Sequence, residues 1–315
     1  MRSDQKIWQL IDKVNEVILG KQQFVFEVIA AFLAGGNVLL EDIPGVGKTT
    51  MALALSKVFG MEWNRVQFTP DVLPSDLTGF SIYQKEEGRF VYQPGAVFCN
   101  LLLADEINRT SPKTQSALLE VMEEKQVTVD GETRPLPRPF HVIATQNPTG
   151  TAGTQLLPPA QMDRFLISLS MGYPDPHSEI LLAKQVSVGK RTDQLRPIVS
   201  TEELENIQEE INDLFIHDAI YQYIVELVGK TRNHPLIELG ASPRATIALV
   251  KFTRAVAWLN GFEFVQPSDV VDHFIPIVSH RVVLSHKAQM EGISKKGVLQ
   301  RILADIPKPA LRRMT

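Results

Sequence analysis

The sequence predicts an α/β protein with a mostly parallel five-stranded sheet, followed by an all-helical second domain. Over about the first 170 residues, short apolar runs alternate with helical patterns, as is typical of a parallel sheet covered by helices. The two prolines of YPDPH, residues 173–177, interrupt this alternation. Beyond about residue 200, apolar residues recur three or four positions apart. We therefore divide the 315 residues into a first domain, 1–196, and a second, 197–315.

Composition is that of a folded globular protein, with 44% hydrophobic and 22% charged residues. The 32 basic and 36 acidic side chains give a net charge of −4, which argues against a protein that mainly coats nucleic acid. The single cysteine, Cys99, excludes a disulfide framework and a cysteine-based zinc site, and we expect it in the core. The sequence shows no signal-peptide pattern and no apolar run of roughly 18 residues, so we expect a cytoplasmic protein without a membrane span.

Five apolar runs predict the strands of the sheet. They are NVLLE, RVQFT, NLLLA, HVIAT and FLISLSM, at residues 37–41, 65–69, 100–104, 141–145 and 165–171. Largely apolar runs are typical of strands that are covered on both faces. A helix is predicted at residues 49–59, and another begins at the hydroxyl cap Ser111, with Pro112 at its first position, and ends near Lys125.

Two segments predict hairpins that interrupt the alternation of strands and helices. Residues 78–95 contain two strand-like pieces around the turn EEG, and residues 126–140 carry an Asp-Gly turn after an alternating run. In the first hairpin, Phe90 and Tyr92 are interpreted as packing residues rather than as a platform for bases. Both hairpins precede core strands, so we expect them to project from the sheet.

Three segments of the second domain show the clearest helical periodicity. They lie at residues 201–214, 218–232 and 245–260. Ser242 and Pro243 provide a hydroxyl cap and a first-position proline directly before the third of them.

The segment EDIPGVGKTT, residues 41–50, carries the strongest chemical signal. It lies between a predicted strand and a predicted helix, where backbone N–H groups and the helix dipole bind phosphates. Lys48 is expected to meet the β- and γ-phosphates, and Thr49 to coordinate Mg²⁺. The expected nucleotide contacts are Gly45, Val46, Gly47, Lys48, Thr49 and Thr50. The usual G-x-x-x-x-G-K-[ST] pattern begins with glycine, whereas this chain has Asp42. A glycine turn that only caps a helix is the plain alternative.

The apolar run LLLADEIN ends in two carboxylates, which a parallel strand delivers to the ligand-binding edge of its sheet. Asp105 is expected to hold Mg²⁺, and Glu106 to polarise the attacking water as general base. A solvated strand end explains an isolated Asp-Glu pair equally well. Here the pair follows Lys48 by 105 − 48 = 57 residues, with one strand and one hairpin between them, and that order favours the catalytic interpretation.

Four further side chains are candidates for the chemistry of a triphosphate. Asn147, in ATQNP at the end of the next strand, is a neutral group that can orient a water, although a turn asparagine before proline explains it as well. Arg164 precedes the last strand, Arg244 lies on a first helical turn and Arg109 follows the carboxylates. Each arginine is able to stabilise charge on a γ-phosphate, although any single one is more often a surface ion pair.

Together these motifs resemble the MoxR family of AAA+ ATPases. The resemblance rests on GVGKTT, LLLADEINR with SPKTQSALLEVMEE, ATQNP, AQMDRF and GASPRA, and extends from about residue 17 to residue 281. It implies an AAA+ P-loop core with a helical lid, ATP and Mg²⁺ as cofactors, and hydrolysis of ATP to ADP and phosphate. It also implies that Val17, Ile18 and Gly20, in VILGKQ, pack on adenine.

The resemblance assigns further roles. Asn147 corresponds to sensor 1, Arg164 to the finger supplied to a neighbouring subunit, and Arg244 to sensor 2 acting in cis or in trans, whereas the role of Arg109 stays open. The hairpins resemble the helix-2 insert and the pre-sensor-1 hairpin of a clade that includes magnesium-chelatase motors and minichromosome-maintenance helicases. The resemblance also implies homo-oligomeric rings, commonly hexamers, and chaperone-like maturation or metal loading of client protein complexes, often with von Willebrand A domain proteins.

Three functions remain open: an ATP-hydrolysing remodeling chaperone, which we favour, a nucleic-acid motor of the same clade, and a scaffold that binds ATP as a switch. The hairpin tips KEE, residues 85–87, and DGE, residues 130–132, are acidic and would repel nucleic acid. Glu106, Asn147 and Arg164 together form a set for activating water, which a pure ATP binder does not need.

Overall fold

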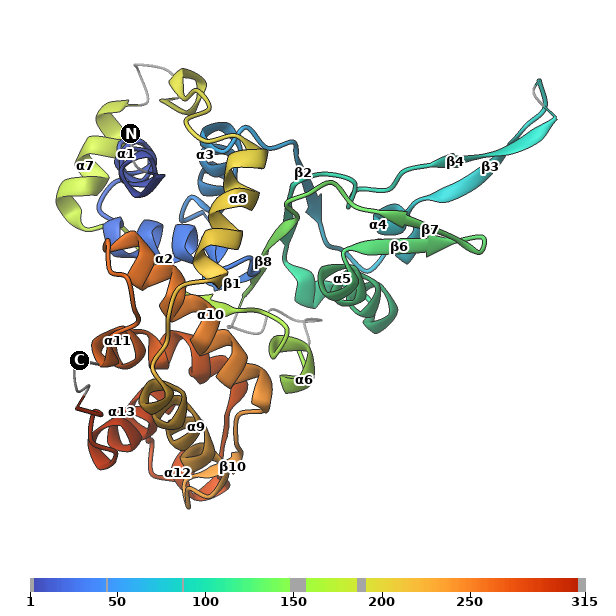
Figure 1. Cartoon of the computed structure of the whole chain (residues 1–315). Helices are drawn as coiled ribbons and strands as arrows, with labels where there is room; N and C mark the ends of the chain where they lie inside the picture. The colour runs from blue at the N-terminus through green and yellow to red at the C-terminus, as the bar shows by residue number, and fades with distance from the viewer. Residues whose placement is uncertain (1–2, 44, 87, 148–156, 186–190, 311–315) are drawn as a thin grey trace.

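The computed structural model describes residues 3–43, 45–86, 88–147, 157–185 and 191–310. An α/β core, two projecting hairpins and a helical lid are distinct in it (Figure 1). Among these residues, no helix combines the length and the apolar character that a membrane crossing requires.

The core sheet has five parallel strands in the order β2-β5-β8-β1-β9. This confirms the predicted parallel sheet. The strands are β1 (Val38–Glu41), β2 (Trp63–Gln67), β5 (Leu101–Asp105), β8 (His141–Gln146) and β9 (Ile167–Leu169). All residues of β5 and β8 are buried, as their apolar sequences predict. We call the two ends of the sheet the carboxyl edge, where these strands end, and the amino edge, where they begin.

Helices cover the sheet and connect its strands. They are α1 (Ser3–Asn15), α2 (Gln22–Leu33), α3 (Lys48–Val58), α4 (Pro74–Thr78), α5 (Pro112–Glu124), α6 (Pro159–Met162) and α7 (Pro176–Gln185), with the 3₁₀ turns η1 (Ile107–Arg109) and η2 (Arg191–Gln194). The predicted cap of α5 is present, because the Ser111 hydroxyl accepts a hydrogen bond from the Thr114 N–H at 3.3 Å.

Both predicted hairpins form and project away from the lid (Figure 1). The first pairs β3 (Phe80–Gln84) with β4 (Arg89–Gln93), and the second pairs β6 (Gln126–Val129) with β7 (Glu132–Pro135). In the second, Asp130 and Gly131 have φ values of 55° and 77°, which an Asp-Gly hairpin turn requires. The hairpins lie side by side, since the Arg134 guanidinium stacks over the Tyr92 ring at 4.0 Å.

The C-terminal region is helical, as predicted. Its elements are α8 (Thr201–Asn212), α9 (Asp218–Arg232), α10 (Pro243–Leu259), α11 (Pro267–Val278), η3 (Ser279–Arg281), α12 (His286–Met290) and α13 (Lys295–Asp305). It also contains a short antiparallel ladder of β10 (Ile237–Leu239) and β11 (Val283–Leu284). These strands have three and two residues, so their sequence pattern is too short to predict.

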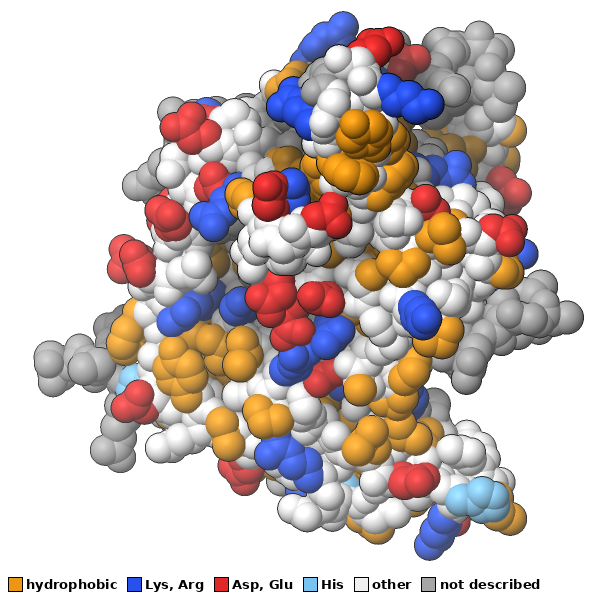
Figure 2. All heavy atoms as spheres, turned by 90° about the vertical axis from the view of Figure 1, so that its right-hand side faces the viewer, with side chains coloured by type: hydrophobic (Ala, Val, Ile, Leu, Met, Phe, Trp, Pro, Cys, Tyr) orange, Lys and Arg blue, Asp and Glu red, His pale blue; other side chains and the backbone are white. Residues whose placement is uncertain are grey.

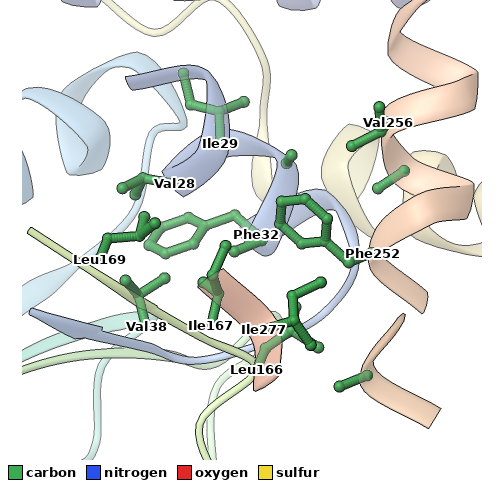
Figure 3. Close-up of a cluster of buried hydrophobic side chains, with 14 of the residues drawn as sticks. Val28, Ile29, Phe32, Val38, Leu166, Ile167, Leu169, Phe252, Val256 and Ile277 are labelled. Carbon is green, nitrogen blue, oxygen red and sulfur yellow. The ribbon is translucent and has the colours of Figure 1, made fainter. Parts of the chain in front are cut away.

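A shared hydrophobic core joins the lid to the sheet. Phe32 of α2, Ile167 of the sheet and Phe252 of the lid belong to one cluster of buried side chains (Figure 3). Burial of each such side chain contributes roughly 1.5–3 kcal/mol. Cys99 belongs to the neighbouring core cluster, and burial raises the pKa of its thiol to about 12, so it is an unreactive core residue, as predicted.

Candidate nucleotide-binding site

The glycine-rich loop between β1 and α3 has the backbone of a phosphate-binding loop. Gly45 and Gly47 have φ values of 85° and 104°, which are left-handed angles that favour glycine. Gly47 caps α3, so the positive end of the helix dipole faces the loop. Lys48 begins the helix and its ammonium donates to the Asp42 carbonyl at 3.2 Å. Thr49 is half-buried on the first turn, and the next residue, Thr50, is exposed.

Asp42, where the usual pattern has glycine, has a structural role. Its buried carboxylate accepts hydrogen bonds from the Ser170 hydroxyl at 2.9 Å, from the Gly172 N–H at 3.0 Å and from the Met171 N–H. These donors follow strand β9. The side chain therefore fixes the start of the loop to the neighbouring strand, which a glycine would not do.

The segment predicted to pack on adenine lies beside the same strand end. Val17 and Ile18 are buried, and the Lys21 ammonium donates to the Tyr173 carbonyl at 2.6 Å. Gly20 has φ 69°, and a Cβ there would lie 2.3 Å from the Ser178 hydroxyl oxygen, so only glycine permits this packing. Because residues 171 and 172 bind Asp42, the fold brings this segment to the phosphate loop.

Asp105 and Glu106 lie at the carboxyl edge, as predicted, and Thr145 connects them. The Thr145 hydroxyl donates to the Asp105 carboxylate at 2.6 Å and accepts from the Glu106 N–H at 2.8 Å. The second Asp105 oxygen accepts from the Arg65 guanidinium at 2.8 Å. Glu106 adopts a left-handed backbone, with φ 57°, which is strained for a residue other than glycine. Both carboxylates are therefore held in defined positions.

The Glu106 carboxylate has two partners. The Gln67 amide donates to its Oε2 at 2.9 Å, and the Arg109 guanidinium donates to the same oxygen at 2.7 Å. Arg109, whose role the resemblance leaves open, contacts the catalytic candidate Glu106 of its own chain. Gln67, Arg65 and Thr145 were missed. The i, i+2 spacing of Arg65 and Gln67 predicts that they share one face of their strand. Their contact with Asp105 and Glu106 depends on the pairing of β2 with β5, which the sequence does not reveal.

A second cluster of polar side chains surrounds Glu41, at the start of the phosphate loop, on the side toward the lid. The Glu41 carboxylate accepts from the Gln146 amide at 2.6 Å and from the Ser168 hydroxyl at 2.9 Å. Burial lowers the pKa of Lys295, at the start of α13, and the negative charge of Glu41 opposes that shift. Asn147 follows Gln146 and is half-buried at the carboxyl edge, where the sequence predicts it.

Arg164 and Arg244 lie at the amino edge. The Leu166 N–H donates to the Asn37 carbonyl at 2.8 Å, so the segment of Arg164 lies beside the start of β1, whereas the phosphate loop follows its end. The four residues of β1 separate the two edges by roughly 13 Å. Arg164 and Arg244 both contact the Glu123 carboxylate. The phosphate loop of the same chain lies at the carboxyl edge.

The phosphate loop, the parallel sheet and the helical lid together define an AAA+ ATPase. The family model of the "ATPase family associated with various cellular activities (AAA)" matches residues 37–167, and that of the AAA lid domain matches residues 229–302. The chain belongs to the MoxR family of AAA+ ATPases, which confirms the predicted family.

The relatives match over nearly the full chain. Chaperone MoxR1 of Mycobacterium tuberculosis is 39% identical over 308 residues, covering 95% of this chain and 81% of the relative. Protein YeaC of Bacillus subtilis is 46% identical, covering 96% and 94%. A solved structure of a protein from Cytophaga hutchinsonii superposes with a TM-score of 0.91 at 39% identity, covering 98% of this chain and 96% of that one.

Proposed function

We propose that the chain hydrolyses ATP with Mg²⁺ in a homo-oligomeric ring and uses the cycle to remodel protein partners. The observation that carries the ATPase part is the Glu106 carboxylate, held by Gln67 and Arg109 at the edge that also bears the phosphate loop. A carboxylate fixed in this way is suited to accept a proton from an attacking water.

The carboxyl edge supplies the groups of a nucleotide site. The loop N–H groups and Lys48 bind the β- and γ-phosphates, and Asn147 orients the water beside Glu106. Thr49 and Asp105 would hold Mg²⁺, because hydroxyl and carboxylate oxygens are the donors that this ion prefers. The bound ion supplies charge neutralisation on the phosphate oxygens. Val17, Ile18 and Gly20 contact adenine.

The arginines at the amino edge support hydrolysis between subunits. Strand β1, which is roughly 13 Å long, separates the edge that carries Arg164 and Arg244 from the phosphate loop of the same chain. We therefore assign both to the nucleotide of a neighbouring subunit, Arg164 as the finger and Arg244 as a sensor acting in trans. A site that needs a second copy makes turnover depend on assembly.

The hairpins support a protein client. Phe80, Ile82, Tyr83 and Phe90 are exposed, and Phe90 is 71% exposed. The sequence interpretation of Phe90 as a packing residue was wrong, because its ring contacts Tyr83 edge-on at 5.3 Å and otherwise faces solvent. Tyr92 does pack, under Arg134 and against Phe98. The face toward which the hairpins project carries exposed apolar side chains (Figure 2). Such patches favour protein partners over nucleic acid.

Several finer points rest on the MoxR resemblance and stay proposals. They are the hexameric ring, von Willebrand A domain partners, and client maturation or metal loading. The cytoplasmic location and the division between residues 196 and 197 rest on the sequence pattern and also stay proposals. The alternative of a nucleic-acid motor is disfavoured by the acidic turn Asp130-Gly131-Glu132. The ATP switch without turnover is disfavoured by the fixed Glu106 carboxylate.

A double substitution of the first hairpin tests the proposal. Tyr83→Ser with Phe90→Ser removes exposed aromatic area that lies far from the nucleotide groups. ATP turnover should stay within two-fold, because the carboxyl edge is untouched, while ATP-dependent protection of a heat-unfolded reporter enzyme from aggregation should fall about 10-fold. Phe215→Ser, at an exposed aromatic residue of the lid, serves as control. Undiminished protection in the double variant would refute the role of the hairpin.

A further inference from the structure

Glu123 connects the two arginines of the amino edge. It lies near the end of α5, and its side chain is 42% exposed. One carboxylate oxygen, Oε2, lies 3.2 Å from Arg164 Nε, and the other, Oε1, accepts a hydrogen bond from Arg244. Arg164 belongs to the core and Arg244 to the lid, so a single carboxylate bridges two parts of the fold.

The backbones that carry the arginines are fixed by a separate set of bonds. The Asp163 carboxylate accepts from the Ser242 hydroxyl at 2.6 Å and from the Arg281 guanidinium. The Arg281 side chain is only 2% exposed, and it also donates to the Asp163 carbonyl at 2.8 Å and to the Ile277 carbonyl at 2.8 Å. Core and lid are thus joined without Glu123. What Glu123 adds is the placement of two long side chains, Arg164, which is half-buried, and Arg244, which is exposed.

Electrostatics gives that placement a purpose. Two guanidinium groups that approach the same phosphate repel each other, and a carboxylate between them offsets that repulsion. Arg164, Arg244 and Glu123 line one cavity of about 200 Å³ at the amino edge. An exposed ion pair contributes at most about 1 kcal/mol to folding. We therefore expect Glu123 to contribute little to the stability of the fold.

The two contacts differ in kind. Arg244 makes a hydrogen bond to Glu123, whereas the Arg164 Nε–H is close to the carboxylate but not aligned for a hydrogen bond. The contact of Arg164 with Glu123 is therefore an ion pair without a hydrogen bond from Nε, and we infer that Arg164 exchanges it for a stronger anion more readily than Arg244 does.

We propose that Glu123 is a positioning residue for the neighbouring subunit's triphosphate. It holds Arg164 and Arg244 together, and Arg164 leaves it for the γ-phosphate when the neighbour binds ATP. This inference rests on the proposed function, in which the arginines act on another subunit.

Mixed assemblies test the proposal. The acceptor variant, Arg164→Ala, has an intact phosphate loop but lacks the finger arginine. The donor variant, Lys48→Ala, has intact arginines but a defective phosphate loop. In a mixture of the two, turnover arises only where arginines of a donor subunit meet the phosphate loop of an acceptor subunit. Glu123→Gln is then placed in the donor or in the acceptor. We expect about a 10-fold loss of kcat with the substitution in the donor and less than two-fold in the acceptor. Glu123→Asp in the donor should restore part of the rate, and Glu124→Gln, at the exposed neighbouring position, should change neither.

The rates of the mixed assemblies distinguish a positioning role of Glu123 from a general structural role. Equal losses from donor and acceptor would mean a general structural role and would overturn the proposal, as would full activity with Glu123→Gln in the donor. If the mixture with unchanged Glu123 shows no turnover, the inter-subunit mechanism fails first, and the role of Glu123 falls with it.

Discussion

The two edges of the sheet place their charged groups in opposite ways. At the carboxyl edge, Asp105 and Glu106 are held by a buried threonine and by side chains of the adjacent strand. At the amino edge, Arg164 and Arg244 extend from the core and the lid to one exposed glutamate. The carboxylates are set within the packed sheet, and the arginines stand at its surface.

The two edges are therefore suited to different roles. The carboxyl edge brings together, within one chain, the phosphate loop, the two carboxylates and the segment that we propose for adenine. The amino edge carries two arginines on one glutamate, and we propose that these arginines act on the triphosphate of a neighbouring subunit. Under the proposed function, the two edges are complementary halves of a hydrolytic site, and each half can be altered without the other.

The largest effect is expected at the amino edge. Arg164→Ala should lower ATP turnover of the assembled protein about 10³-fold, because the charge that spreads over the γ-phosphate loses its partner. Its Kd for ATP should stay within two-fold, since the loop is intact. Lys48→Ala should instead abolish ATP binding in the same titration. Arg301→Ala, an exposed arginine of α13, is the matched control. Loss of ATP binding in Arg164→Ala would contradict the division between the edges.

A somewhat smaller effect is expected at the carboxyl edge. Glu106→Gln should keep ATP binding and lose turnover about 10²-fold, because an amide does not accept the proton of the attacking water. Single-turnover kinetics with bound ATP measures this directly. Glu120→Gln, exposed on α5, is the control. Turnover at an undiminished rate in Glu106→Gln would show that Glu106 is not the general base.

The smallest effect concerns stability at the amino edge. His141 is buried, stacks on Phe32 at 4.4 Å and has its pKa lowered by burial from 6.5 to about 4. Between these values the unfolded chain binds the proton and the folded chain does not. Stability should therefore fall as pH drops below 6.5, by about 1.4 kcal/mol per pH unit for this group.

Urea unfolding at pH 7 and pH 5.5 checks that dependence. His141→Asn should flatten it by about 1 kcal/mol, because the titrating group is gone. His286→Gln, at an exposed histidine, should leave the dependence as it is in the unchanged chain. An identical pH dependence in His141→Asn would show that another group carries the effect.

Much of the fold and of the nucleotide half was predictable, because it depends on neighbours in sequence. The apolar strands, the cap at Ser111 and the glycine turn before Lys48 are local features, and each occurs where predicted. The exposure of Phe90 and the contacts of Gln67 were not predictable. Both depend on which strands lie next to each other and on how far a hairpin projects.

The order of the elements, the phosphate loop and the catalytic candidates can be predicted from the order of residues, because backbone preferences, apolar patterns and short motifs each extend over only a few positions. The tertiary structure alone decided that Thr145 links the two carboxylates and that Glu123 brings together arginines 80 positions apart. Those contacts join segments distant along the chain, and only the packing of the sheet against the lid brings them within reach.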